Sequence, residues 1–353
     1  MGIRTIVFIL LVLAVSVQGQ NRDQAARMES LLKRFPEADL NKDGKLTTDE
    51  VRAYQEQRRK QRGDQKQQAT LTPTHSDVPY GDHERHKLDL WIADSKEPKP
   101  LVVCIHGGGF RAGDKSSYRK NRSLIQPLLD AGISVASINY RLTEGGKYPF
   151  PAAMHDGGRA LQFLRFHSKK YNLDKTRIAA TGGSAGACMS MWLAFHEDLA
   201  DPESNDPIAR ESTRLAAIAP NAGQSTLDIR TFEEWFGVKG IQEHPALRPL
   251  FGIPAGSDEI KITEALSALM VEASPITHLT KDDPPAFLSY SSGDVPVSKD
   301  SSHNLWVHHP RLGIKLKEAM DRLGIECHVS YRGGPKITKY DNVTVFLISQ
   351  LKK

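Results

Sequence analysis

A serine flanked by glycines lies near the middle of the chain. Residues 182–186 read Gly-Gly-Ser-Ala-Gly, which fits the pattern G-x-S-x-G, between a strand-like segment at 177–180 and a helix-like segment at 187–195. Glycines in such a strand-to-helix turn allow a strained backbone that exposes the serine hydroxyl at the edge of a sheet. The pattern therefore predicts that Ser184 is a nucleophile, although a glycine-rich run taken alone can be simply a turn.

A second glycine-rich run, His-Gly-Gly-Gly-Phe at 106–110, directly follows the strand-like residues 101–105. Glycines there let backbone N–H groups approach an acyl oxygen, so we expect the amides of Gly107, Gly108 and Ala185 to form an oxyanion hole. A phosphate-binding loop is the alternative, but the run lacks the Lys-Ser/Thr ending of a P-loop. The two motifs together favour acyl transfer.

Further motifs are spread over most of the same region. With these motifs, residues from about 78 to 351 resemble the α/β-hydrolase family that includes hormone-sensitive-lipase-like esterases and feruloyl or acetyl-xylan esterases. The resemblance implies serine ester hydrolysis, with small esters or acylated polysaccharides as substrates. Ala187 departs from the family, in which a glycine is frequent at that place. The further motifs are Tyr140-Arg141-Leu142, Phe150-Pro151-Ala152-Ala153, Asp156 and Asp283-Pro284-Pro285.

The resemblance also implies an acid member of a catalytic triad after a late strand. Strand-like residues 286–289 lead into Asp294, which we therefore expect to hold a histidine in the correct tautomer and to stabilise its imidazolium. A loop-capping aspartate is the alternative interpretation of Asp294.

The base of the triad is missing from its expected place. The family has a histidine shortly after the last strand, but no histidine follows the strand-like residues 329–331. His308 and His309 are the main substitutes, and both precede Pro310, which could begin a helix. The alternative is that both are surface or helix-start residues, because closeness to Asp294 in sequence does not establish geometry. His328 lies in a strand-like segment and is expected to be structural.

The elements that must position these residues are alternating strands and helices. Short apolar runs at 88–93, 101–105 and 133–138 indicate strands, whereas the patterns at 153–166 and 187–195 indicate helices. Strands that alternate with helices predict βαβ units. The predicted fold class is therefore α/β, with a mainly parallel sheet covered by helices on both faces.

A separate motif near the N-terminus predicts a calcium site of the EF-hand type. A hard cation takes oxygen ligands, which the side chains of Asp39, Asn41 and Asp43, the carbonyl of Lys45 and both oxygens of Glu50 can supply. A lone EF-hand is expected to pack on the hydrolase, to pair between chains or to bind weakly, and we favour a structural or docking role over a sensor. The pattern at loop positions one, three, five, six, seven, nine and twelve is Asp39, Asn41, Asp43, Gly44, Lys45, Thr47 and Glu50, with the apolar Leu46 at position eight.

The predicted organisation has four parts. Residues 1–19 form a signal peptide, since Arg4 precedes an apolar run that is shorter than the ~20 residues of a spanning helix. The other parts are an EF-hand segment at 20–60, a linker at 61–75 and the hydrolase domain at 76–353. The protein is then secreted or periplasmic, with no stable membrane span after cleavage. An uncleaved anchor is the alternative.

Composition agrees with a globular protein. The chain has 353 residues with 39% hydrophobic and 25% charged side chains, which excludes a multi-span membrane protein and a disordered chain. Most of the net charge of +5 comes from a basic stretch at 51–70, so a nucleic-acid-binding face on the main domain is not expected. Cys104, Cys188 and Cys327 lie in apolar surroundings and are expected to be buried free thiols.

Three functions remain open. The first is a serine carboxylic-ester hydrolase with a calcium site. The second is a non-catalytic binding protein on a hydrolase scaffold, because the expected histidine is absent. The third is an esterase that calcium controls through the EF-hand.

Overall fold

The computed structural model describes residues 28–54, 56, 70–241, 243–253 and 260–353. The chain divides into two units, residues 1–69 and residues 70–353, and each is described by itself. The predicted signal peptide at 1–19 lies outside the described residues, as does most of the predicted linker.

The second unit begins before the predicted boundary. The amide of Leu71 donates to the carbonyl of Arg119 at 2.7 Å, and the indole of Trp91 donates to the carbonyl of Leu71 at 3.3 Å. His75 is already the first residue of a strand. Residues 70–75, which we expected to be linker, are therefore attached to the hydrolase unit.

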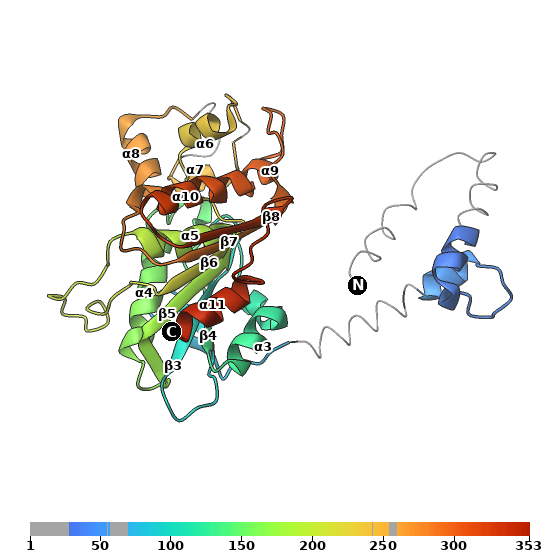
Figure 1. The fold of residues 1–353 in the computed structure, drawn as a ribbon, viewed down its shortest axis with the longest axis horizontal. Coiled ribbons are helices and arrows are strands. Elements are labelled where there is room, and N and C mark those ends of the chain that lie inside the picture. Colours follow the sequence, from blue (N-terminus) through green and yellow to red (C-terminus); the bar gives the residue numbers. More distant parts are fainter. Residues whose placement is uncertain (1–27, 55, 57–69, 242, 254–259) are drawn as a thin grey trace. The chain divides into compact units, whose positions relative to one another are not determined.

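A single eight-stranded sheet runs through the second unit (Figure 1). The strand order is β1-β2-β4-β3-β5-β6-β7-β8; β1 and β2 pair antiparallel, β2 also pairs antiparallel with β4, and the remaining pairs are parallel. The predicted mainly parallel α/β fold is confirmed. The strands are β1 (His75–Pro79), β2 (Lys87–Trp91), β3 (Lys99–Ile105), β4 (Ser134–Ile138), β5 (Leu173–Gly183), β6 (Ala217–Asn221), β7 (Ala286–Gly293) and β8 (Cys327–Arg332).

Helices cover both faces because side chains of a strand alternate between them. In β3, Val103 and Ile105 belong to one apolar cluster, whereas Val102 and Cys104 belong to another. The first cluster contains residues of α4 (Ala152–Phe166), α5 (Ala185–Phe195) and α10 (Pro310–Arg322), and the second contains residues of α3 (Arg122–Asp130) and α11 (Val343–Leu351).

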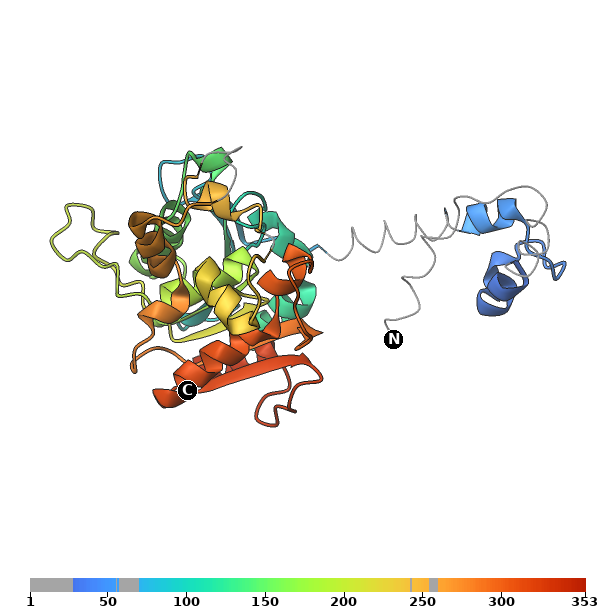
Figure 2. The same cartoon turned by 90° about the horizontal axis from the view of Figure 1, so that it is seen from above.

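Short helices gather at one end of the second unit in Figure 1, and Figure 2 views the same group from above. Side chains of α6, α7 and α9 take part in the apolar cluster that also holds α5. This group therefore packs on the same face of the sheet as α5. The short helices are α6 (Ile229–Phe236), α7 (Leu247–Leu250), α8 (Glu264–Glu272) and α9 (His303–Val307), with 3-10 turns at η2 (Lys115–Lys120), η3 (Glu144–Gly146) and η4 (Pro275–His278).

The three cysteines confirm the prediction of buried free thiols. Cys104 lies in β3, Cys188 in α5 and Cys327 in β8, and all three are buried and unpaired. Burial raises the pKa of each thiol, that of Cys327 to about 12. They are therefore packing residues and poor nucleophiles.

In the described part of the first unit, helical segments at residues 28–34 and 48–54 flank the acidic loop and the 3-10 turn η1 (Pro36–Ala38). Ala38, Leu46 and Tyr54 are buried in a small apolar cluster between them. Leu46, the apolar residue at loop position eight, is in that cluster. Within the described ranges of the chain, no helix is both long and apolar enough to traverse a bilayer.

Candidate active site

Ser184 occupies a sharp turn between β5 and α5. Its backbone has φ +52° and ψ −117°, a strained combination for a residue with a side chain, and its amide donates to the carbonyl of Asn221 at 2.9 Å. A Cβ atom at Gly186 would lie 2.1 Å from the carbonyl oxygen of Ile105, and one at Gly182 would lie 2.4 Å from the backbone of Gly186. Only glycine fits at either position, which explains the glycines of the G-x-S-x-G pattern.

The hydroxyl of Ser184 meets the imidazole of His308. The distance from Ser184 Oγ to His308 Nε2 is 2.8 Å, and His308 Nδ1 lies 3.1 Å from the carbonyl oxygen of Asn304. A carbonyl only accepts, so Nδ1 carries the proton and Nε2 is free to accept the serine proton. Burial lowers the pKa of His308, which keeps the ring in this neutral form near neutral pH.

The two candidate histidines have different roles. His308 ends α9, whereas His309 is fully buried at the start of α10, where its Nδ1 accepts from the amide of Arg311. His309 Nε2 donates to the carbonyl of Val295 at 2.9 Å. The helix-start interpretation therefore fits His309 but not His308. His328 Nε2 pairs with Glu326 at 2.9 Å.

Asp294 does not contact the imidazole that faces Ser184, in contrast to its predicted role. Its Oδ1 lies 2.9 Å from Nη2 of Arg311 and 3.8 Å from Nδ1 of His309. The reason is that the Asp294 carboxylate lies near His309, whereas the ring of His308 points toward Ser184. A backbone carbonyl, that of Asn304, stands where the family resemblance implies a carboxylate.

The glycine-rich loop after β3 lies against the nucleophile turn. A Cβ atom at Gly107 would lie 2.6 Å from the carbonyl oxygen of Gly183, and Gly108 has φ +115°. His106 Nδ1 is 2.9 Å from the carbonyl of Gly107, which fixes that peptide and directs the amide of Gly108 the opposite way. Among the described residues, no acceptor is bonded to the amides of Gly107, Gly108 or Ala185. These three amides therefore remain available for an oxyanion.

Buried neighbours hold His106 in place. Its ring stacks on Tyr140 with centroids 4.3 Å apart, and the Tyr140 hydroxyl donates to the His106 carbonyl at 2.8 Å. Arg85 donates to the carbonyls of Tyr140 and Gly113 on the same side. Burial lowers the pKa of His106 to about 4, so the ring is a neutral donor that positions the loop.

A cavity of about 910 Å³ opens on one side of Ser184. Ser184, His308 and Gly107 line it together with many hydroxyl and amide side chains. Among the described residues that line it there is no Asp, Glu, Lys or Arg. Its polar side chains include Ser117, Asn121, Ser123, Asn221, Ser302 and Asn304.

A second pocket of about 40 Å³ meets Ser184 on another side. Its walls are mainly apolar and come from the short helices: Phe232 of α6, Leu247 of α7 and Trp306 of α9. Ser184 thus lies between a wide polar space and a narrow apolar one.

The acidic loop of the first unit is closed by its own carboxylates. Asp39 Oδ2 accepts from the amide of Gly44 at 2.9 Å, while the Glu50 carboxylate accepts from the amides of Asn41 and Thr47 at 3.3 and 3.0 Å. Asp39 Oδ1 is buried and accepts no hydrogen bond from the described residues. A buried carboxylate oxygen without a partner is costly unless a cation takes it, so the loop fits a hard metal ion.

A mainly parallel sheet that carries a strained serine between β5 and α5, and a glycine-rich loop after β3, defines an α/β-hydrolase. The BD-FAE family model matches residues 88–308, well over half of the chain. The protein belongs to this family.

Curated relatives carry names of ester hydrolases. The probable carboxylic ester hydrolase LipM of Mycobacterium tuberculosis is 28% identical over 232 residues, which are 63% of this chain and 49% of the relative. The probable isoprenylcysteine alpha-carbonyl methylesterase ICMEL1 of Arabidopsis thaliana is 26% identical over 277 residues, 76% of this chain and 55% of the relative. The chain thus spans about half the length of these relatives.

Solved structures share the fold. A truncated carbohydrate esterase from gut microbiota superposes with a TM-score of 0.60 at 22% identity, over 81% of this chain and 98% of that one. An acetyl ester-xyloside bifunctional hydrolase from Caldicellulosiruptor lactoaceticus gives a TM-score of 0.55 at 22% identity, over 74% and 86%.

Proposed function

We propose that this protein hydrolyses carboxylic esters, with Ser184 as the nucleophile and His308 as the general base. The contact of 2.8 Å between Ser184 Oγ and His308 Nε2 carries the proposal. It replaces the histidine that the family resemblance implies after the last strand, so it also speaks against the alternative of a non-catalytic binding protein.

Each step moves one proton through His308. Nε2 takes the proton of Ser184 Oγ as this oxygen attacks the ester carbonyl, and the resulting oxyanion accepts from the amides of Gly107, Gly108 and Ala185. The tetrahedral species collapses, and the imidazolium gives its proton to the departing alkoxide. Water then attacks the acyl group while His308 takes a proton from it, and the second collapse returns that proton to Ser184 Oγ.

Short acyl esters of carbohydrates are the substrates we propose. The 910 Å³ cavity offers neutral hydroxyl and amide groups, which are suited to sugar hydroxyls, whereas the much smaller pocket of 40 Å³ has mainly apolar walls that suit a short acyl chain. Two solved structures of similar fold, a carbohydrate esterase and an acetyl ester-xyloside bifunctional hydrolase, support this choice. Simple short-chain esters without a sugar are substrates of the same class that need only the site for the acyl group.

Labelling by a fluorophosphonate probe tests the nucleophile. The unchanged protein should be labelled and should hydrolyse p-nitrophenyl acetate, whereas Ser184→Ala should do neither. If the two proteins hydrolyse at the same background rate while both bind a glycan, the binding protein is the correct interpretation.

We further propose a calcium ion in the first unit, bound by the side chains of Asp39, Asn41 and Asp43, the carbonyl of Lys45 and the carboxylate of Glu50. The orphaned Asp39 Oδ1 supports this set. Calorimetric titration with Ca²⁺ should give one site, with a dissociation constant of up to about 10⁻³ M for an extracellular site. Asp39→Ala should abolish the heat of binding.

Export is the last part of the proposal, supported by the apolar N-terminal sequence. A mature N-terminus near residue 20, found by mass spectrometry of protein recovered outside the cytoplasm, would agree with it. An intact Met1 on such protein would not.

A further inference from the structure

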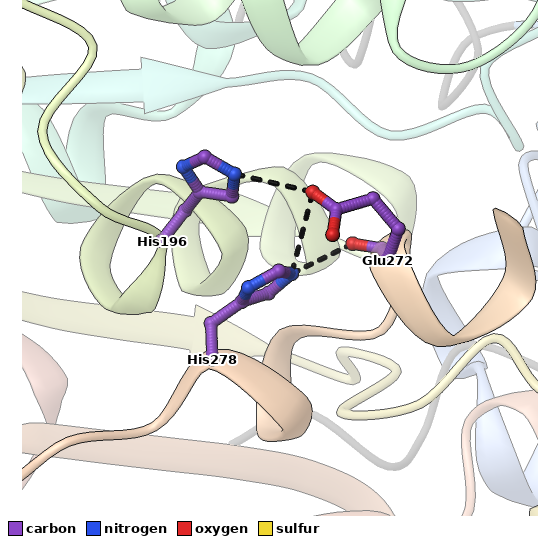
Figure 3. Close-up of side chains that lie close together, drawn as sticks. All are labelled: His196, Glu272 and His278. Atoms are coloured by element: carbon purple, nitrogen blue, oxygen red, sulfur yellow. Dashed lines mark hydrogen bonds and ion pairs between the residues drawn. The ribbon is translucent and has the colours of Figure 1, made fainter. Parts of the chain in front are cut away.

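Two imidazoles and a carboxylate meet at a place that the ester hydrolysis does not use (Figure 3). His196 directly follows α5, Glu272 is the last residue of α8 and His278 is the last residue of η4. One ligand atom from each lies within 4.8 Å of the others. Because α5 starts next to Ser184 and rises 1.5 Å per residue, this cluster is roughly 18 Å from the nucleophile.

The spacing of these atoms suits a metal ion. His196 Nε2 is 3.2 Å, and His278 Nε2 is 3.9 Å, from Glu272 Oε1. Ligand atoms of a tetrahedral Zn²⁺ with bonds of about 2.1 Å lie about 3.4 Å apart, which is between these two values. The side chains of His196, His278 and Glu272 are 20%, 16% and 49% exposed, so an ion can enter from solvent.

The hydrogen bonds of His196 favour a cation between the ring and the carboxylate. Its Nδ1 lies 2.9 Å from the carbonyl of Glu197, so this nitrogen holds the proton and the other ring nitrogen points a lone pair at Glu272. Two acceptors in contact repel each other unless a positive charge is placed between them. A second ring proton or a metal ion provides that charge, and the bond from Nδ1 to a carbonyl is the usual support of a metal-binding histidine.

Trp192 holds the cluster from the inside. This buried ring stacks on His196 with centroids 4.1 Å apart and meets His278 edge-on at 6.0 Å. Its indole donates to the Glu272 carbonyl at 3.0 Å, the same oxygen to which His278 Nε2 bonds at 2.7 Å. The carbonyl therefore keeps the bond from Trp192 when His278 Nε2 gives up its own bond to this oxygen in order to bind a metal ion.

We propose that His196, Glu272 and His278 form a binding site for a divalent transition metal ion, with Zn²⁺ as the ion of best fit. Two imidazole nitrogens and one carboxylate oxygen are ligands that Zn²⁺ accepts, and a water can complete its coordination. On binding, His278 changes tautomer: its proton moves from Nε2 to Nδ1 through exchange with solvent, so the ring stays neutral and the lone pair of Nε2 is free for the ion. The ion links the end of α5 to α8 and η4 and thereby stabilises the second unit.

Zinc titration of the full chain, without a polyhistidine tag and after treatment with a chelator, tests the site. Competition with a chromophoric zinc chelator, in excess Ca²⁺ to fill the first unit, should show one protein-bound Zn²⁺. His196→Gln and His278→Gln should each weaken binding at least ~100-fold, since loss of a supporting residue alone costs 10–100-fold. At a hundredfold excess over the dissociation constant, Zn²⁺ should raise the Tm of the unchanged protein by about 5 °C.

His328→Gln is the matched control, because His328 is also a half-exposed histidine that pairs with a glutamate, yet a lysine takes the place of the second imidazole there. Its zinc affinity should equal that of the unchanged protein. Glu272→Gln provides a second test that leaves both rings in place and should weaken binding similarly. The proposal fails if the unchanged protein binds no Zn²⁺ tighter than ~100 μM, or if the site variants bind as well as His328→Gln. All variants should keep ester hydrolysis, so loss of zinc binding and loss of the proposed activity are distinguishable.

Discussion

At the scale of single residues, the unusual feature is that the proposed general base, His308, is hydrogen-bonded to a backbone carbonyl and not to a carboxylate. The carbonyl of Asn304 holds the His308 proton on Nδ1, which gives the tautomer that a carboxylate would select. A neutral carbonyl stabilises the imidazolium less than a carboxylate does, because it has a dipole and no net charge. The Asn304 carbonyl therefore preserves the orientation of the His308 ring, but it lacks part of the electrostatic stabilisation that a carboxylate would give to the imidazolium.

Replacing the base and the expected acid should have very different effects. His308→Ala removes the proton acceptor of Ser184 and should lower kcat by at least ~10⁴-fold. Asp294→Asn removes a half-exposed pair with Arg311, whose contribution is about 0–1 kcal/mol, and should lower kcat/KM by less than ~10-fold. Steady-state kinetics on p-nitrophenyl acetate measures both. A loss near 10⁴-fold for Asp294→Asn would show that this carboxylate reaches His308 during catalysis.

The pH dependence of kcat/KM should report the protonation of the His308 imidazole. Only the neutral ring accepts the serine proton, so kcat/KM rises with pH as the imidazolium loses its proton. Burial lowers the pKa of His308, which places the midpoint below about 6.5. His106, with a pKa of about 4, stays neutral across this range. A midpoint above pH 7, or one that shifts in Asp294→Asn, contradicts this assignment.

At the scale of elements, the apolar pattern predicted the strands β2, β3 and β4 and the helices α4 and α5. It did not predict β1, β6, α3, α11 or the short helices α6 to α9. The strand before Ser184 and the helix after it follow from apolar periodicity, and the glycines at 182 and 186 mark the close approach between them. The sequence left two candidates for the base, His308 and His309. It could not choose between them, because His308 reaches Ser184 from the end of α9, which is far from Ser184 in sequence. The carbonyl of Asn304 has no signal in the sequence, because every residue carries one. The apolar pocket depends on α6, α7 and α9, whose packing no motif specifies.

The walls of the small pocket should set the preferred acyl length. Leu247→Ala removes three carbon atoms from the pocket and should raise the butyrate-to-acetate ratio of kcat/KM by about tenfold, as expected for room for an extra methylene. A buried leucine truncated to alanine also costs about 2–5 kcal/mol, so Tm is measured alongside. Leu323→Ala, at an exposed leucine after α10, should change neither quantity. An unchanged ratio in Leu247→Ala would place the acyl group elsewhere.

At the scale of the whole molecule, the chain joins a small unit with an acidic loop to a much larger unit that contains the proposed active site. The residues that line both pockets at Ser184 come from the second unit, between His106 and Thr344. Likewise, the described hydrogen bonds of His308, Ser184 and His106 all end within that unit. The supports of the proposed catalytic residues that the structure describes therefore lie within the second unit.

Calcium removal should for this reason leave hydrolysis unchanged. Treatment with a calcium-selective chelator, and separately Asp39→Ala, should keep kcat/KM for p-nitrophenyl acetate within about twofold, because a site that is not coupled to the reaction contributes no free energy to it. In the chelated protein, the small unit itself should lose stability, since the buried Asp39 Oδ1 is then left without a partner. Limited proteolysis should accordingly cut within residues 28–54 faster without Ca²⁺, at an unchanged rate of cutting in the second unit. A parallel loss of hydrolysis in both the chelated protein and the variant would instead establish calcium control of the enzyme.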